Sequence, residues 1–232
     1  MKPNRNCFSL VELFVFLGMI AVTAVFLSSV LREARRMAGQ SLCSDNLKRL
    51  GGITAAYAKD YDGTYFMSSP VWGKGPTQYG RFLHKNGLIP QEDGDGGEWI
   101  SGKYACPELV VFSKIKQNKD RISTLHTYGI RVDSRPGDPD AYRGMYWNLN
   151  FQNFSKLKNP AAYNHYGCSL RGGSKLPVTT YYSKLVTGDR LAGIHGGKAG
   201  VWCLDGHVEG ITAVRLAESF GGSEKAWHDI QE

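Results

Sequence analysis

Several features that define common classes of protein are missing from this 232-residue chain. Its net charge is +7, but it has no run of five or more basic residues, so composition gives little support for nucleic-acid binding. Its five cysteines form no Cys-x-x-Cys pair, which argues against zinc ribbons and thioredoxin-type redox motifs. HExxH, GxSxG and phosphate-loop motifs are also missing, so no common catalytic motif marks the chain as an enzyme.

The N-terminal part carries the strongest signal that is present. Residues 1–7 contain two basic residues and no acid, and residues 8–31 are almost entirely apolar. This 24-residue stretch exceeds the roughly 20 residues that a helix needs to cross the hydrocarbon core of a membrane. A cleaved secretory signal would have a shorter apolar region followed by a small-x-small site, and the sequence around Leu31 is a poor site. The pattern therefore favours a membrane anchor.

Glu12 is the only charged residue in this apolar stretch. A carboxylate costs about 2.5–3.5 kcal/mol at the centre of a bilayer and less near the interface, so such residues usually have a partner. The segment 8–13, Phe-Ser-Leu-Val-Glu-Leu, resembles the cleavage and methylation motif of type IV prepilins and type II secretion pseudopilins. The resemblance implies that prepilin peptidase removes residues 1–7, that the new amino group of Phe8 is methylated, and that Glu12 neutralises the amine of a neighbouring subunit. The alternative is an uncleaved anchor in which Glu12 reaches the membrane interface.

Two observations bear on processing and orientation. Cys7 stands where the family usually has glycine before the cut. Arg32, Arg35 and Arg36 follow the apolar stretch, so a count of positive charges alone would place that side in the cytoplasm. The expected orientation therefore comes from the resemblance, which implies a single pass through the inner membrane with the rest of the chain outside the cytoplasm.

Helical periodicity continues beyond the apolar stretch. Residues 32–58 are predicted to be an amphipathic continuation of the same helix that packs on a sheet. Its predicted apolar positions, together with one at the end of the preceding stretch, are Leu31, Ala34, Ala38, Leu42, Leu50 and Ile53. The segment Asp60-Tyr61-Asp62-Gly63 then ends the helix. Asp60 and Asp62 are a possible fragment of a calcium loop, but the later ligands are missing, so a simple turn is preferred.

Residues 59–232 are predicted to form an exported globular head. A short helix is expected near residues 81–86, and aromatic-rich strands are expected at residues 145–149 and 178–182. The C-terminal tail, residues 213–232, is expected to hold a short amphipathic helix, with Trp227 as a packing anchor. The predicted fold class is α+β and pilin-like, with a long N-terminal helix packed on an antiparallel β-sheet head.

A second specific pattern lies at residues 195–209, where nine residues separate His195 from Asp205-Gly206. It resembles the His-x9-Asp-Gly element of pseudopilin-like families in planctomycetes, verrucomicrobia and lentisphaerae. Asp205-Gly206 predicts a two-residue hairpin turn that places Cys203 opposite Val208. His195 has no such explanation in the sequence. A metal or acid–base role for His195, Asp205 and His207 is the alternative to the structural interpretation.

The family resemblance also implies a disulfide between Cys43 and Cys106. If it forms, Cys168 is the available partner for Cys203, and an even number of cysteines beyond the membrane suits an oxidising compartment. The alternative for the first pair is two free buried thiols.

The sequence thus predicts a structural pseudopilin-like subunit with no catalytic residues and no cofactor, apart from the possible calcium. Its expected partners are prepilin peptidase, other pilin or pseudopilin subunits and the inner membrane, with no nucleic acid. One alternative is a membrane-anchored extracytoplasmic protein that binds polysaccharide or another surface ligand. Another is an anchored hydrolase, whose activity would depend on His195 or Asp205.

Overall fold

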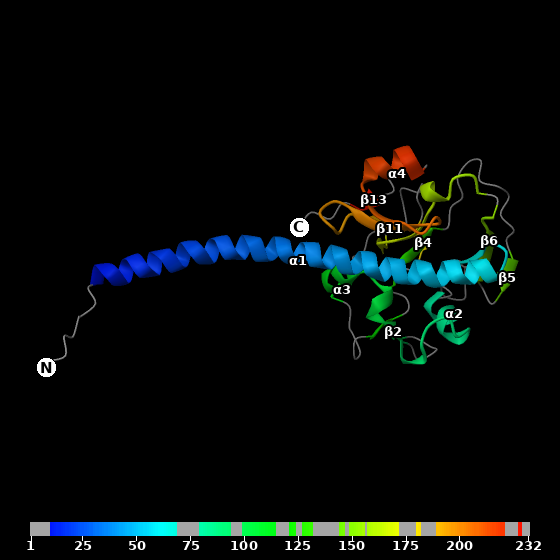
Figure 1. The fold of residues 1–232 in the computed structure, drawn as a ribbon, viewed down its shortest axis with the longest axis horizontal. Helices are drawn as coiled ribbons and strands as arrows, with labels where there is room; N and C mark the ends of the chain where they lie inside the picture. Colours follow the sequence, from blue (N-terminus) through cyan, green and yellow to red (C-terminus); the bar gives the residue numbers. More distant parts are fainter. Residues whose placement is uncertain are drawn as a thin grey trace. The chain divides into compact units, whose positions relative to one another are not determined.

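The structure is a computed structural model that describes residues 10–68, 79–93, 99–114, 121–123, 127–131, 144–146, 149–155, 157–171, 180–181, 189–220 and 227–228. The chain divides into two compact units, Met1–Ala38 and Gly39–Glu232. The long helix α1 (Leu10–Asp60) contributes to both units. We call the second unit the head. Its helices and mostly antiparallel sheets, together with α1, confirm the predicted α+β class (Figure 1).

The first unit consists of the N-terminal part of α1, and its apolar side chains are exposed. The most apolar 18-residue window of α1 has a mean hydropathy of 2.5 and no buried residue, so by length and composition the helix could be a single membrane span. The hydroxyls of Thr23, Ser28 and Ser29 each donate to a carbonyl of the preceding turn, at 2.7–2.9 Å. These three hydroxyls are therefore satisfied within the helix, as an apolar environment requires. Its exposed large apolar residues are Leu10, Val11, Leu13, Phe14, Val15, Phe16, Leu17, Met19, Ile20, Val22, Val25, Phe26, Leu27, Val30, Leu31 and Met37.

The second part of α1 belongs to the head and buries one face. Cys43, Leu47, Leu50, Thr54 and Ala58 follow one another at intervals of three or four residues and are each at most 2% exposed. An amphipathic continuation of the helix was predicted correctly, but part of the predicted apolar stripe was wrong. Leu42, for example, is 51% exposed, whereas the polar residue Asn46 lies on the buried face and donates to the carbonyl of Ala105 at 3.0 Å.

The largest sheet of the head has five strands in the order β12-β11-β7-β4-β9. All neighbouring pairs are antiparallel except β4 and β9, which are parallel. The strand bounds are β4 Gly129–Arg131, β7 Asn164–Gly167, β9 Thr180–Tyr181, β11 Ala199–Cys203 and β12 Val208–Ile211. All five residues of β11 are buried, so this strand lies in the interior and shows no alternation between core and solvent.

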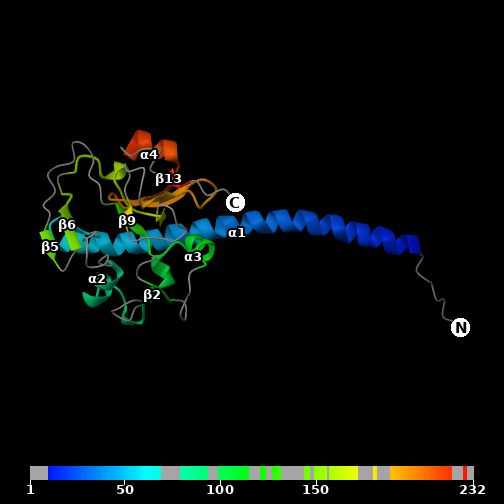
Figure 2. The ribbon, with the colours of Figure 1, turned by 180° about the vertical axis from the view of Figure 1, so that it is seen from behind.

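Smaller sheets and short helices complete the described part of the head. The sheets are β1-β6-β5 (Thr64–Ser68, Leu149–Asn153, Gly144–Tyr146), β13-β10-β8 (Trp227–His228, Arg190–Ala192, Ser169–Leu170) and β2-β3 (Trp99–Ser101, Arg121–Ser123). The helices are α2 (Tyr79–Lys85), α3 (Pro107–Phe112) and α4 (Ala213–Phe220), with 3-10 turns at Gln91–Asp93, Gly102–Tyr104 and Pro160–Ala162. In both ribbon views α4, β11 and β13 lie on one side of the head part of α1, and α2, α3 and β2 lie on the other (Figure 2).

Several local predictions are confirmed. Helix α2 matches the helix predicted near residues 81–86, and α4 begins at the predicted tail segment. Trp227 is half-buried and packs against the core, as expected. The strand expected at 178–182 coincides in part with β9, whereas the single strand expected at 145–149 is wrong, because Tyr146 ends β5 and Leu149 begins β6 and the two strands pair antiparallel. Residues 147–148, 178–179 and 182 lie outside the described residues.

Helix α1 and strand β11 approach each other closely at Gly51. A Cβ atom at Gly51 would overlap the buried indole of Trp202, so only glycine fits at this point of the helix. One turn away, the Thr54 hydroxyl lies 2.8 Å from the Tyr166 hydroxyl on β7. The glycine that weakens the helical pattern in the sequence thus allows α1 to pack directly on the central strands.

The β11–β12 hairpin differs from its prediction by one residue in register. Trp202, and not Cys203, pairs with Val208. The Gly206 amide donates to the Cys203 carbonyl at 2.9 Å, so the turn spans residues 203–206. Gly206 has a φ of +96° while the φ of Asp205 is not positive, whereas the predicted two-residue turn needs positive φ at both residues. The observed geometry is the longer hairpin loop, in which a glycine in the left-handed region follows an ordinary turn.

Candidate functional site

Four potential metal-ligating side chains from distant parts of the sequence meet inside the head. Cys43, Cys106, Cys168 and His195 are each at most 2% exposed, and their Sγ and ring nitrogen atoms all lie within 4.8 Å of one another. The Sγ atoms of Cys43 and Cys168 are 3.5 Å apart, and Nε2 of His195 lies 3.5 Å from Cys106 Sγ and 3.7 Å from Cys168 Sγ. We call these four residues the Cys3His cluster.

Each member is positioned by regular structure. Cys43 lies on the buried face of α1, and Cys106 is the N-cap of α3, directly before Pro107. Cys168 follows β7, and its amide donates to the carbonyl of Gly200 on β11 at 3.0 Å. The cluster therefore combines a residue within α1 with residues at the ends of α3 and β7 and in the turn before β11.

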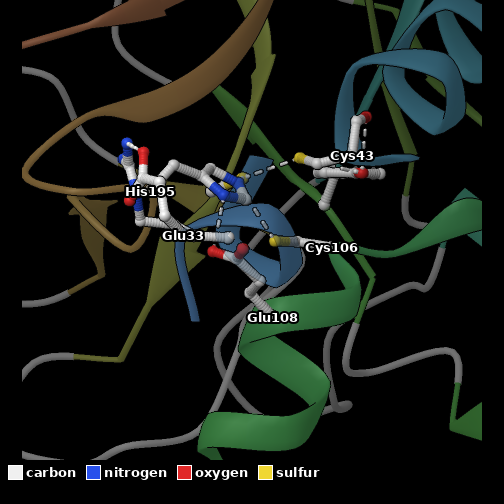
Figure 3. A network of polar contacts seen from close by, with 8 residues as sticks. Glu33, Cys43, Cys106, Glu108 and His195 are labelled. Atoms are coloured by element: carbon white, nitrogen blue, oxygen red, sulfur yellow. Dashed lines mark hydrogen bonds and ion pairs between the residues drawn. The ribbon is translucent and has the colours of Figure 1, made fainter. Parts of the chain in front are cut away.

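His195 lies in the tight turn between β10 and β11. Its amide donates to the Lys198 carbonyl at 3.0 Å, and both Gly196 and Gly197 have positive φ. This turn directs the imidazole inward, where it faces the Cys106 thiol with Glu108 beside it (Figure 3).

Glu108 and Tyr128 also contact the Cys3His cluster. Oε2 of Glu108 lies 2.6 Å from Nδ1 of His195, so the ring nitrogen that does not face the sulfurs is held by a carboxylate. The Tyr128 hydroxyl donates to the Cys43 carbonyl at 3.0 Å and to Cys43 Sγ at 3.3 Å. A carboxylate behind a ligating histidine and a donor to a thiolate are typical outer contacts of metal centres.

Two glycines leave room for the cluster and its contacts. A Cβ atom at Gly39 would overlap the Glu108 carboxylate. A Cβ atom at Gly200 would lie 3.2 Å from Cys43 Sγ, which is tighter than most packed contacts. Both glycines thus lie where a side chain would displace a member of the cluster or its carboxylate.

The thiols and the imidazole strongly influence one another's protonation. Burial by itself lowers the pKa of His195, but the contacts with Cys106 and Glu108 outweigh it and raise that pKa to about 9. Burial raises the pKa of Cys106 to about 11, and burial with the neighbouring thiols raises the pKa of Cys168 well above its usual value. Burial also opposes ionisation of Cys43, but contacts with the other two thiols and Tyr128 lower its pKa well below the usual value.

The predicted disulfides are not present. Cys43, Cys106, Cys168 and Cys203 are all free and buried. The sulfur of Cys43 lies 3.5 Å from that of Cys168, which was not its predicted partner, and this distance far exceeds a disulfide bond of about 2.05 Å. Cys203 does not belong to the Cys3His cluster. The prediction divided four cysteines into two pairs, whereas the fold places three of them around one histidine.

The residues of the His-x9-Asp-Gly element lie in two separate parts of the head. His195 belongs to the cluster, whereas Asp205 and Gly206 form the exposed turn of the β11–β12 hairpin. Oδ1 of Asp205 accepts from the amide of His207 at 3.1 Å and lies 2.5 Å from Nδ1 of the same residue. Ligand atoms of His207, Glu209 and buried Cys203 also lie within 4.8 Å of one another, but this second group is partly exposed.

The other predicted site residues lie apart from the cluster. Glu12 is in the first turn of α1 and is exposed, and Cys7 and Phe8 lie outside the described residues. Asp60 and Asp62 lie at the end of α1 and in the turn that follows, and neither belongs to the two groups of potential metal ligands found among the described residues.

Sequence reasoning did not identify Glu108, Tyr128, Gly39 or Gly200. Glu108 is two residues from Cys106, but nothing in the sequence connects it with His195. The only sequence signals were the cysteines themselves and a histidine that lacked an explanation. Chemically, three thiols and one imidazole around a common centre can bind a soft cation.

No protein-family model, curated protein or solved structure matches the chain. The family of the chain therefore rests on the two sequence motifs alone and stays a prediction.

Proposed function

We propose that the chain is a pilin-like structural subunit, processed by prepilin peptidase and assembled through its N-terminal helix into a pilus or pseudopilus of a type II secretion or related system. The observation that carries the proposal is the apolar part of α1, whose side chains are exposed in the single chain and which contains one carboxylate, Glu12. An apolar surface of this size must be covered by lipid or by other protein. In a filament subunit, lipid covers this surface before assembly and other subunits cover it afterwards.

The length of this segment fits a lipid membrane. Residues 10–31 form 22 helical residues, about 33 Å at 1.5 Å per residue, which is close to the roughly 30 Å thickness of a hydrocarbon core. Thr23, Ser28 and Ser29 bond back to their own helix, so they add little cost in lipid. The segment can therefore be stored in the membrane before assembly.

Glu12 fits an environment formed by the neighbouring subunits of a filament. A carboxylate among apolar side chains is costly alone and much less costly beside an ammonium group. Removal of residues 1–7 would create such a group at Phe8. In a bundle of identical helices, pairing between Glu12 and the amine of a neighbour would set the axial register of the subunits.

The proposal is tested by mass spectrometry of the N-terminal peptide of the membrane-extracted chain, expressed with and without a prepilin peptidase. The expected result is a chain that starts at methylated Phe8 only when the peptidase is present. Cys7→Gly is the matched control, because it restores the residue that the family has before the cut. A chain that keeps Met1 in both variants, or one that is cut beyond Leu31, would sink the proposal and leave an anchored or secreted binding domain.

A further inference from the structure

We propose that Cys43, Cys106, Cys168 and His195 bind one zinc ion in a closed, tetrahedral, structural site inside the head. The site goes beyond the proposed filament function and does not depend on it, because every residue involved belongs to the head. Four observations support the site: the distances between the ligand atoms, their burial, the outer contacts and the origin of the ligands in the sequence.

The distances fit a tetrahedron around zinc. Zn–S bonds of about 2.3 Å and Zn–N bonds of about 2.0–2.1 Å place tetrahedral ligands about 3.8 Å apart for two sulfurs and about 3.6 Å apart for sulfur and nitrogen. The observed separations are 3.5 Å between Cys43 and Cys168, 3.5 Å between Cys106 and His195, and 3.7 Å between Cys168 and His195. All donor atoms lie within 4.8 Å of one another, so small side-chain shifts place an ion at their centre.

The chemistry and burial of the ligands select the ion and the type of site. Three thiolates and one imidazole are soft or borderline ligands, which favour zinc over magnesium or calcium. All four residues are at most 2% exposed, so no coordination position is open to water or substrate. Four protein ligands in a closed site are typical of structural zinc, whereas catalytic zinc keeps one position free.

The outer contacts fit the same ion. Glu108 holds Nδ1 of His195 at 2.6 Å, which leaves Nε2 as the nitrogen directed toward the sulfurs. Tyr128 donates to Cys43 Sγ at 3.3 Å, which stabilises a thiolate. A carboxylate–histidine pair of this kind fixes the tautomer and the ring orientation of metal ligands.

The four ligands come from segments that are far apart in the sequence. Cys43 is on α1, Cys106 caps α3, Cys168 follows β7, and His195 lies in the turn before β11. One ion would cross-link all of them, whereas a disulfide could join only two of the three cysteines. Bound zinc would therefore stabilise the docking of α1 on the sheet of the head, since metal binding to ligands assembled by the fold adds to the folding free energy.

The first experiment measures the zinc content of the full-length chain, purified in detergent without an affinity tag. The expected result is one zinc per chain in the native protein, loss of that zinc in Cys106→Ser, and retention in Cys203→Ser. Cys203 is the matched control because it is a buried cysteine outside the Cys3His cluster. Zinc that is lost from Cys203→Ser but kept in Cys106→Ser would overturn the assignment.

The second experiment needs no variant, so it holds even if Cys106→Ser fails to fold. The unsubstituted chain is reduced, depleted of metal and titrated with Co²⁺. Tetrahedral thiolate coordination predicts visible d–d bands and sulfur-to-cobalt charge-transfer bands that saturate at one equivalent and disappear when zinc is added. The proposal is overturned by a chain that gives no such bands, or by a native chain whose mass and peptide map show a disulfide between two of the three cluster cysteines.

Discussion

The imidazole of His195 and the carboxylate of Glu108 lie 2.6 Å apart, in a contact between the turn before β11 and the first turn of α3. The contact occupies Nδ1 and leaves Nε2 facing the thiols of Cys106 and Cys168. Neither residue has a motif that connects it with the other, and the fold alone brings them together. If the Cys3His cluster holds zinc, Glu108 positions a ligand without touching the ion.

Glu108→Gln is therefore expected to weaken zinc binding by about 10–100-fold while the stoichiometry stays at one per chain. The amide keeps the shape of the side chain but lacks the charge that favours the ligating tautomer. Competition with a chromophoric chelator measures the affinity. Glu218→Gln on the exposed part of α4 is the control and should leave it unchanged. Equal affinities for both variants would show that Glu108 does not support the site.

Two adjacent glycines of α1 should respond oppositely to alanine. Gly51→Ala places a methyl group against the buried indole of Trp202 and should destabilise the head by about 1–3 kcal/mol. Gly52→Ala meets nothing within 4 Å and should stabilise the helix by about 0.5–1 kcal/mol. Urea unfolding of the full chain in detergent, followed by tryptophan fluorescence, measures both. A stabilising Gly51→Ala would mean that α1 does not pack on β11 as described.

The β11–β12 hairpin should tolerate alanine at Gly210 but not at Gly206. Gly206 has a φ of +96°, so Gly206→Ala should cost about 1–2 kcal/mol of stability. Gly210 on β12 has no positive φ, and a Cβ there would meet its neighbours at 3.5–3.7 Å, so Gly210→Ala should change stability by less than about 0.5 kcal/mol. The same unfolding measurement compares them, and a neutral Gly206→Ala would exclude the observed turn.

The proposed role of Glu12 predicts a defect in assembly. Glu12→Gln should still lose its leader, but its incorporation into filaments should fall about tenfold or more, since an unpaired buried amine costs more than the 1.4 kcal/mol that corresponds to that factor. Quantification of sheared filaments against the membrane pool measures the effect. Glu33→Gln is the control, because Glu33 is exposed on the same helix and pairs with Arg36. Normal incorporation of Glu12→Gln would exclude the register role.

The sequence predicted those features that depend on local pattern. The helix of residues 10–60, the short helices α2 and α4 and the α+β class all follow from periodicity and turn residues. The buried face of α1 was only partly predictable, because the fold buries Asn46 and Thr54 through hydrogen bonds to other elements, and no helical periodicity reports those partners.

The candidate site was harder to predict, since all its contacts are between distant segments. The four cysteines and His195 were each recognised, but their spacing could not show that three sulfurs and one imidazole share a centre. The Cys43–Cys106 disulfide was implied by the family resemblance, and Cys168–Cys203 was the pair that remained; neither step distinguishes two bonds from one cluster. At Asp205-Gly206 the two-residue hairpin turn was predicted in place of the observed longer loop. Both kinds of turn accept glycine at residue 206, so the sequence does not distinguish them.

The most direct measurement is X-ray absorption at the zinc edge of the full-length native chain in detergent. Zinc in the Cys3His cluster predicts a first shell of three sulfurs at about 2.3 Å and one nitrogen at about 2.0–2.1 Å. An absorption spectrum dominated by oxygen ligands, or a reduced native chain that holds no zinc, would contradict a metal centre built from Cys43, Cys106, Cys168 and His195.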